Sequence, residues 1–235
     1  MGLLEWAHRR ETASQRRAWS LIKTVARSDF PVIPGLHHAL LAERRFRKGS
    51  LRLLWSKVYH APLLRIQCDR VGAGLLMHEG MPKILGNLRI RLGDRVTLNG
   101  EQVWIAAGSG ATKTLDVGDD TSLGQRTELI VGESINIGRH VLFANRVSLV
   151  GYDGHPLDPF ARARGEAPGS DRSGSITIND YAWIGTEAMI MKGVTVGRGA
   201  IVAARSVVRT SVPDLAIVAG DPARVVRYVE PPEEW

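Results

Sequence analysis

Cysteine is almost absent from the chain: Cys68 is the single cysteine among 235 residues. One thiol cannot form an intrachain disulfide, and it excludes a disulfide framework and any Cys-rich zinc module. We therefore expect a reducing compartment, and the cytoplasm is the default.

Long apolar runs are also missing. The chain opens with MGLLEWAHRRETASQRR, which has no apolar run of signal-peptide length after a basic start, and no stretch approaches the length of a transmembrane helix. With 44% hydrophobic and 23% charged residues, the composition is that of a soluble globular protein. We expect neither a signal peptide nor a transmembrane segment.

The formal charge of +7 is unevenly distributed. Residues 1–70 carry 14 Lys and Arg against five acids, a net +9, whereas residues 71–235 carry 17 against 19. The basic segment could lie on an anionic membrane or on nucleic acid, or it could be a solvated helical face whose arginine stems cover apolar surface. Its leucine and aromatic spacing predicts helices that end near Pro62.

From residue 71 onward the sequence repeats with period six. Every sixth residue from position 178 to position 208 is aliphatic, and small or aliphatic residues recur at the fifth position of each hexad. The later frame comprises Ile178, Ile184, Ile190, Val196, Val202 and Val208. The earlier frames comprise Leu92, Leu98 and Trp104, then Val117, Leu123 and Leu129, and, after two extra residues, Ile137, Phe143 and Leu149.

A period of six indicates a coil with three flat sides, in which each side is one short strand and one turn. The aliphatic residue of each hexad points inward, glycine or a small polar residue forms the corner, and strands of successive coils pair in parallel. We therefore predict a mainly β fold, a parallel β-helix over residues 71–213. The basic helical segment 1–70 and the tail 214–235 are candidate caps for its open ends.

The repeats VGDDTS, LGQRTE, IGRHVL, IGTEAM and VGRGAI resemble those of the hexapeptide-repeat acyltransferases, which have a left-handed parallel β-helix. The strings GHPLDP (154–159), WIG (183–185) and AGDPARVVR (219–227) follow in that family's order and spacing. The resemblance is greatest to the maltose, galactoside and glycan O-acetyltransferases. The segment from YHAPLLRIQCDRVGAG to MPKILGNLRIRLGDRV is similar to a subgroup that acetylates surface polysaccharide or lipopolysaccharide.

The hexads are interrupted at residues 152–175, a loop long enough to suggest a function. It contains His155, which is followed by Pro156 and flanked by Asp153 and Asp158. An imidazole can accept a proton from a sugar hydroxyl at neutral pH. Alone, His155 would be an ordinary surface histidine, but the resemblance implies that it is the general base. Asp153 or Asp158 would either orient it or cap the loop.

Other nucleophiles have weaker support. Cys68 has no patterned histidine near it, Ser148 is an ordinary corner residue, and no G-x-S-x-G motif is present. The fold also occurs in zinc-dependent carbonic anhydrases, but the chain lacks their H-x4-H pair. We therefore expect direct transfer without an acyl-enzyme and without a metal.

The resemblance implies acetyl-coenzyme A as donor, bound between adjacent subunits. Carried onto this sequence, the family's donor contacts are Trp183, Thr186, Ala204, Thr210, Arg224 and Arg227. The Thr186 backbone N–H would face the thioester carbonyl, and the two arginines would pair with phosphates. Alternatively, Trp183 packs against a neighbouring subunit, Ala204 is an ordinary corner residue, and the arginines are solvated.

On the acceptor side the sequence departs from the sugar acetyltransferases. Where they have an asparagine one coil before the histidine, this chain has Gly124 or Gln125, and the nearest carboxylate is Glu133. Gln125 and Glu133 could bind a hydroxyl-rich acceptor other than a simple free sugar, or they could be solvated corner residues.

The sequence thus predicts a homotrimeric, acetyl-CoA-dependent O-acetyltransferase for a sugar or glycan acceptor. The alternatives are an N-acetyltransferase for an amino sugar and a noncatalytic β-helix scaffold. Residues 1–70 are expected to contact an anionic membrane surface peripherally, and no nucleic acid is expected as a partner.

Overall fold

The computed structural model describes residues 2–78, 80–108, 112–231 and 233. The end residues 1, 232, 234 and 235 of the two predicted terminal segments lie outside this range. The chain divides into two compact units, Met1–Arg47 and Lys48–Trp235. This division precedes residue 71, where the sequence changes in character, because the residues just before the first strand pack with the strands.

The first unit is helical. It contains α1 (Leu3–His8), α2 (Ala13–Arg27) and the beginning of α3 (Pro34–Trp55), which crosses the division between the units. Thr12 caps α2: its hydroxyl accepts from the Gln15 N–H, and the Gln15 side chain accepts in return from the Thr12 N–H. This capping box sets the start of the helix locally.

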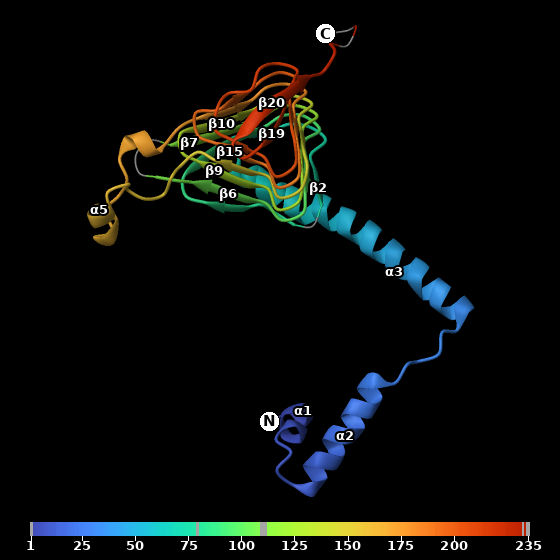
Figure 1. Cartoon of the computed structure of the whole chain (residues 1–235). Helices are drawn as coiled ribbons and strands as arrows, with labels where there is room; N and C mark the ends of the chain where they lie inside the picture. Colours follow the sequence, from blue (N-terminus) through green and yellow to red (C-terminus); the bar gives the residue numbers. More distant parts are fainter. Residues whose placement is uncertain (1, 79, 109–111, 232, 234–235) are drawn as a thin grey trace. The chain divides into compact units, whose positions relative to one another are not determined.

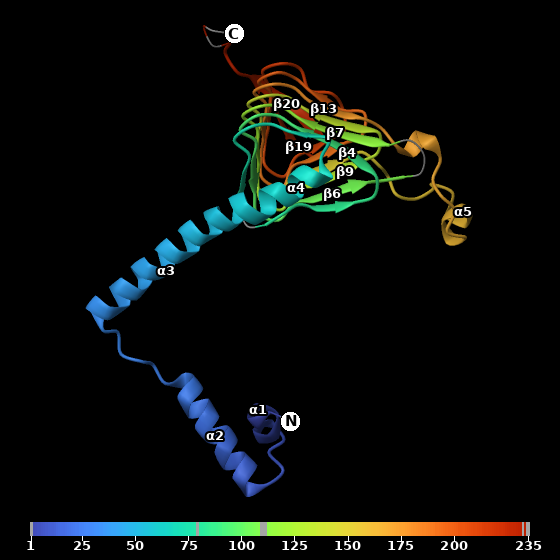
Figure 2. The same cartoon turned by 180° about the vertical axis from the view of Figure 1, so that it is seen from behind.

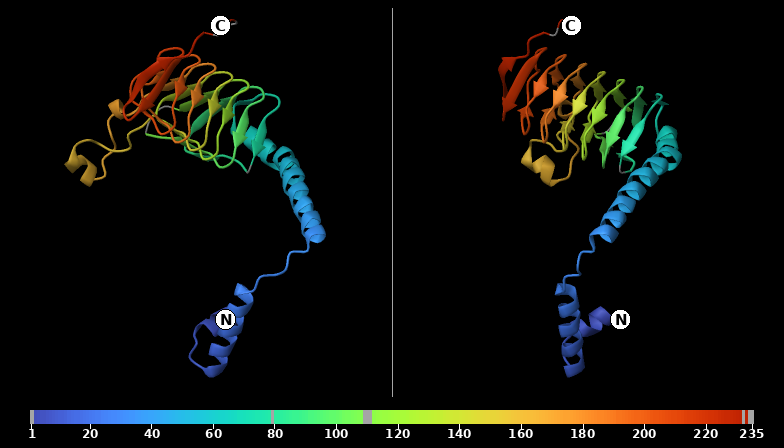
Figure 3. Two further views of the ribbon diagram at one scale, coloured as in Figure 1. Left: turned by 45° about the vertical axis from the view of Figure 1, so that its right-hand side comes forward. Right: turned by 90° about the vertical axis from the view of Figure 1, so that its right-hand side faces the viewer.

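The second unit is the parallel β-helix predicted from the hexads, and its coils stack in sequence order (Figures 1 and 3). Face 1 consists of β1 (Arg70–Val71), β4 (Leu88–Leu92), β7 (Lys113–Val117), β10 (Ser134–Ile137), β13 (Ile176–Ile178) and β16 (Thr195–Val196). Face 2 consists of β2 (Leu76–His78), β5 (Thr97–Asn99), β8 (Ser122–Leu123), β11 (Leu142–Phe143), β14 (Trp183–Ile184), β17 (Ile201–Val202), β19 (Ala216–Gly220) and β20 (Ala223–Tyr228). Face 3 consists of β3 (Lys83–Leu85), β6 (Val103–Ala106), β9 (Glu128–Val131), β12 (Ser148–Val150), β15 (Met189–Met191) and β18 (Val207–Val208). Among these described strands, β20 alone pairs antiparallel, with β19.

The core is the inward column of the hexads. Every residue of the predicted frames is buried, including Trp104, Leu149 and Ile184 at 0% exposure. Burying one such side chain stabilises the fold by about 1.5–3 kcal/mol. The predicted fold class, a left-handed parallel β-helix, is confirmed. The prediction succeeded because each period of six residues forms one strand and one corner.

The helical run before the strands covers one end of the β-helix (Figure 2). It continues from α3 through a π-helical turn, η1 (Ser56–His60), into α4 (Ala61–Gln67). The Ser56 hydroxyl donates to the Met77 carbonyl at 2.7 Å, and Leu64 is fully buried in the core. These contacts close the edge that the first coil would otherwise leave open.

The expected helix end near Pro62 was wrong, because Pro62 lies in the first turn of α4. A proline in the first turn of a helix costs no hydrogen bond, because the N–H that it lacks would have no partner within that helix. The preceding turn is the wider π-helical turn η1, which leaves room for the proline ring where an α-helical turn would clash with it.

Candidate active site

The three corners of the β-helix define where side chains can meet. The 1–2 corner joins face 1 to face 2, the 2–3 corner joins face 2 to face 3, and the 3–1 corner returns to face 1 of the next coil. The chain between β12 and β13, residues 151–175, therefore leaves the coils at the 3–1 corner. It contains α5 (Pro159–Ala163) and η2 (Ser170–Arg172), and α5 stands away from the coils (Figures 1 and 2).

His155 lies near the start of this loop with its side chain exposed. Gly154, at φ 81°, turns the chain immediately before it, a conformation that glycine adopts without strain. No described residue forms a hydrogen bond or ion pair with the imidazole, so both ring nitrogens are open to an incoming ligand.

The flanking carboxylates hold the loop in place, and their contacts are with groups other than the His155 imidazole. Asp153 pairs with Lys192 at 2.9 Å and with Arg172 at 3.5 Å, which fastens the loop base to the coil after β15. Asp158 caps α5 by accepting from the N–H groups of Phe160 and Ala161. Of the two roles considered for these acids, the contacts are those of loop anchors.

Glu133 lies at the same corner one coil earlier. Its carboxylate accepts from the Ser175 hydroxyl at 3.1 Å, where the loop rejoins the coils. Thr210 also belongs to the 3–1 corner, after the last strand of face 3, and its side chain is exposed. The 3–1 corner therefore gathers His155, Glu133, Asp153, Asp158 and Thr210.

The other predicted residues lie elsewhere on the β-helix. Gln125, Thr186 and Ala204 occupy equivalent positions at the 2–3 corner of three coils, all exposed. Trp183 lies on face 2 with 49% of its surface exposed. Arg224 and Arg227 lie on β20, at the edge of face 2. Within one chain, the predicted general base therefore lies at a different corner from most of the predicted donor contacts.

The 2–3 corner has unpaired backbone donors. The Gln125 N–H donates to the Asn145 side-chain oxygen at 3.0 Å. The equivalent N–H groups of Asn145, Thr186 and Ala204 have no acceptor among the described residues. Gly185 makes this arrangement possible, since a Cβ there would lie 2.6 Å from the Ala204 nitrogen.

A depression of about 300 Å³ lies at this corner. It is lined by Glu101, Gln125, Arg126, Asn145, Arg146 and Thr186. The sequence-based prediction missed Asn145, Arg126 and Arg146. The repeat could have identified Asn145, because Asn145 follows the inward Phe143 by two residues, just as Thr186 follows the inward Ile184.

Charges beside the depression are paired. Glu187 accepts from Arg146 at 2.6 Å and from Arg205 at 2.8 Å. The hydrogen bonds from Arg205, and then from Arg146, hold the pKa of Glu187 below its usual value. At neutral pH this carboxylate is ionised and joins three successive coils.

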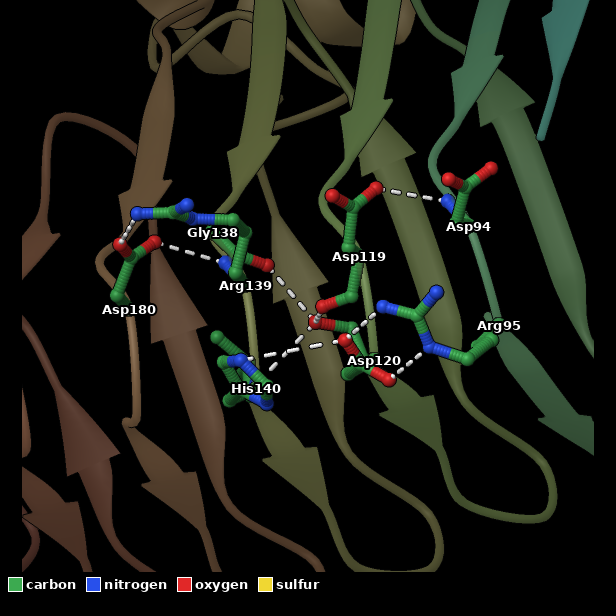
Figure 4. Close-up of polar contacts among 10 residues, drawn as sticks. Asp94, Arg95, Asp119, Asp120, Gly138, Arg139, His140 and Asp180 are labelled. Carbon is green, nitrogen blue, oxygen red and sulfur yellow. Dashed lines mark hydrogen bonds and ion pairs between the residues drawn. The ribbon is translucent and has the colours of Figure 1, made fainter. Parts of the chain in front are cut away.

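The 1–2 corner carries a ladder of its own (Figure 4). Arg95 forms two hydrogen bonds to Asp120, and His140 lies 3.9 Å from the same carboxylate while stacking on Tyr181. The hydrogen bond from Arg95 lowers the pKa of Asp120. These groups satisfy one another along the corner.

Cys68 is unsuited to nucleophilic attack. Burial, reinforced by the adjacent Asp69 carboxylate, raises the pKa of its thiol to about 12. The thiol is therefore protonated at neutral pH, whereas the thiolate is the reactive form. Among the described residues, no three His, Cys, Asp or Glu side chains are grouped so that they could hold a metal ion.

Part of the repeat matches a known protein family. Residues 175–210 match the family described as bacterial transferase hexapeptide (six repeats). The chain is 36% identical over 96 residues to galactoside O-acetyltransferase of Escherichia coli, covering 41% of this chain and 45% of that protein. It is 29% identical over 195 residues to a probable acetyltransferase of Mycobacterium tuberculosis, covering 80% and 60%.

A solved structure shares the fold. A mutant of AntD, an N-acyltransferase from Bacillus cereus, in complex with dTDP-4-amino-4,6-dideoxyglucose and coenzyme A, has a TM-score of 0.59 at 20% identity. The match covers 73% of this chain and 89% of that one. The chain spans about half the length of the curated relatives it matches. Residues 175–210 thus match the bacterial transferase hexapeptide family, and the chain shares its β-helix fold with the N-acyltransferase AntD.

Proposed function

We propose that the protein transfers an acetyl group from acetyl-CoA to a hydroxyl group of a sugar or glycan precursor, with His155 as general base. The observation that carries this proposal is the exposed, unpaired imidazole in the one long interruption among the described coils. The names of the matched relatives, a galactoside O-acetyltransferase among them, support the reaction class.

In the proposed reaction, His155 accepts the proton of the acceptor hydroxyl as its oxygen attacks the thioester carbonyl. The tetrahedral oxyanion receives a hydrogen bond from the Thr186 N–H, which no described residue occupies. Collapse expels the coenzyme A thiolate, which takes the proton from His155. The products are an acetyl ester and coenzyme A, and neither an acyl-enzyme nor a metal is required.

The donor would extend from Thr186 past Ala204 along the 2–3 corner. Trp183 would pack against it, and Arg224 and Arg227 would pair with its phosphates, for which guanidinium groups are well suited. Thr210, at the 3–1 corner of the last coil, is the remaining proposed donor contact. On the acceptor side, Gln125 lines the depression beside Thr186, and Glu133 lies at the corner of His155.

The division of the site between corners supports a homotrimer. Face 3 has an outward column of apolar side chains, namely Leu85, Ile105, Ile130, Val150 and Met191. Face 2 has another, namely Leu142, Trp183, Ile201 and Ile217. The outward column of face 1 is polar and consists of Arg91, Asp116, Asn136, Thr177 and Thr195. A closed trimer would bury faces 2 and 3 and bring the 3–1 corner of one chain to the 2–3 corner of its neighbour.

A second candidate is N-acetylation of an amino sugar, favoured by the likeness to AntD with its bound 4-amino sugar nucleotide. One assay separates the two. The protein is incubated with acetyl-CoA and matched panels of hydroxyl and amino sugars or glycan precursors, and thiol release and product mass are recorded. An ester is cleaved by mild alkali and an amide is not. Absence of transfer to any acceptor would favour the noncatalytic scaffold.

We place the reaction in the cytoplasm, with residues 1–70 in peripheral contact with an anionic membrane surface. In the part of the chain that the structure describes, no helix is both long enough and apolar enough to cross a bilayer.

A further inference from the structure

The first unit exposes many apolar side chains and has almost no core. Among its described side chains, Ala7 and Gln15 are the buried ones. Its large exposed apolar residues are Leu4, Leu21, Val25, Phe30, Val32, Ile33, Leu36, Leu40, Leu41 and Phe46. A 15-residue helix is marginal in water without packing. The first unit therefore does not bury these apolar side chains itself.

Helix α2 has two distinct faces. Ala18, Leu21, Ile22 and Val25 follow one another at helical spacing and form an apolar stripe. The opposite stripe is polar and basic and consists of Arg16, Ser20, Lys23 and Arg27. The helix is thus amphipathic over nearly its whole length.

Helix α1 covers only one flank of α2. The His8 ring meets the Trp19 ring edge-on at 4.9 Å, and Arg10 and Lys23 lie over the indole at 6.0 and 5.9 Å. Leu21 and Val25 remain 67% and 65% exposed. Beyond α2 the chain continues through Ser28–Ile33, where Phe30 is 82% exposed.

We propose that residues 13–33, α2 and the connector after it, lie in the interfacial region of a bilayer that contains anionic lipids. The apolar stripe and Phe30 would enter the boundary between head groups and acyl chains, and the basic stripe would face the lipid phosphates. This narrows the membrane contact from residues 1–70 to one helix and its connector.

Charge favours a bilayer over a second copy of the chain. The first unit has nine Lys and Arg, at positions 9, 10, 16, 17, 23, 27, 44, 45 and 47, against four acids, at positions 5, 11, 29 and 43. Pairing two such units would cover apolar surface but would bring two clusters of positive charge together. An anionic bilayer covers the apolar stripe with its acyl chains and attracts the basic stripe through its phosphates.

Vesicle flotation of the full-length protein tests this proposal independently of acetyl transfer. We expect binding to vesicles of phosphatidylglycerol and phosphatidylcholine at low salt, little binding to pure phosphatidylcholine, and release as salt rises. The double variant Leu21→Gln/Val25→Gln should bind at least about tenfold more weakly, because glutamine keeps the helix but removes the apolar stripe. Lys23→Glu/Arg27→Glu, which reverses two charges of the basic stripe, should weaken binding comparably.

The matched control is Ile66→Gln on α4, an apolar side chain that is 82% exposed in the second unit. It should float like the unmodified protein, and circular dichroism should show equal helix and strand content in all variants. Equal binding to neutral vesicles, or full binding by Leu21→Gln/Val25→Gln, would overturn the proposal. A fall in oligomer mass on making that variant, with no vesicle binding by either protein, would show that a second copy covers the stripe.

Discussion

The 1–2 and 2–3 corners are built from the same kind of tight turn, but they differ in how the N–H of the second turn residue is used. At the 1–2 corner, aspartates of the following coil accept from Ala73, Asp94, Arg139 and Arg198. The exceptions are Asp119 and Asp180, which are followed on the next coil by arginines that cannot accept. At the 2–3 corner of the described coils, the corresponding bond is the one from the Gln125 N–H to the Asn145 side chain.

The comparison shows that the same repeat stabilises the fold at one corner and leaves backbone N–H groups available to a ligand at another. A side-chain carboxylate on each turn N–H adds stability, about 0.5–1.5 kcal/mol for a typical bond and more for an ionised acceptor. The 2–3 corner forgoes this stability at Asn145, Thr186 and Ala204, and its donors stay available to a ligand. The 3–1 corner departs further from the repeat, since it replaces a turn with the loop that presents His155.

The largest effect should come from the 3–1 corner. His155→Ala should lower kcat by about 10² to 10⁴ with the unfolding midpoint unchanged, because the imidazole has no structural partner among the described residues. Steady-state kinetics with saturating acetyl-CoA, together with thermal unfolding, measure both quantities. His140→Ala is the control, a histidine of the 1–2 corner that stacks on Tyr181. Retention of more than about a tenth of the activity by His155→Ala, or an equal loss in His140→Ala, would refute the assignment.

Paired glycine substitutions should give the next largest effect. A Cβ at Gly185 would lie 2.6 Å from the Ala204 nitrogen, and one at Gly197 would lie 2.5 Å from the Pro213 carbonyl carbon. Each alanine should cost about 1–3 kcal/mol of unfolding free energy, because backbone must move. Only Gly185→Ala displaces the Thr186 N–H, and we expect it alone to lower kcat, by about tenfold or more.

Denaturant unfolding and kinetics at a temperature where both variants are folded test this pair. If Gly197→Ala lost as much activity as Gly185→Ala, the distinction between the two corners would have no functional meaning.

The smallest effect concerns pH. Arg205 and Arg146 hold the folded pKa of Glu187 below the ordinary 4.5, so its stabilising contribution is present above that value and is lost as pH falls through the folded pKa. Unfolding midpoints measured from about pH 6 to about pH 3 should fall more steeply for the unmodified protein than for Glu187→Gln. Parallel curves would show that this carboxylate contributes no acid-labile stability.

The coils could be predicted well because each inward residue is recognisable from its spacing: Ile178 and the residues six apart from it are all buried. The loop with His155 could also be located, since the hexads stop there. Residues could not be assigned to corners, because coil lengths vary. β4 and β7 begin 25 residues apart, whereas β7 and β10 begin 21 apart. The link from Arg146 to Glu187 spans 41 residues across the loop, a separation that no period of six reveals.

The helical segment was harder to predict. Pro62 has the pattern of a stop signal, yet the helix passes through it because η1 widens the preceding turn. The roles of Asp153 and Asp158 were equally open, since partners such as Lys192 are brought to the loop only by the stacking of the coils.

The measurement that tests the central claim most directly is complementation between two impaired variants. His155→Ala and Gly185→Ala chains are unfolded together, refolded together and assayed for acetyl transfer, beside each variant refolded alone. If the base comes from one chain and the Thr186 donor from its neighbour, random mixing restores about a quarter of the sites, and the mixture is more active than either variant refolded alone. If the mixture is no more active than the mean of its two parts while forming the same oligomer, the site does not lie between the 3–1 and 2–3 corners of adjacent subunits.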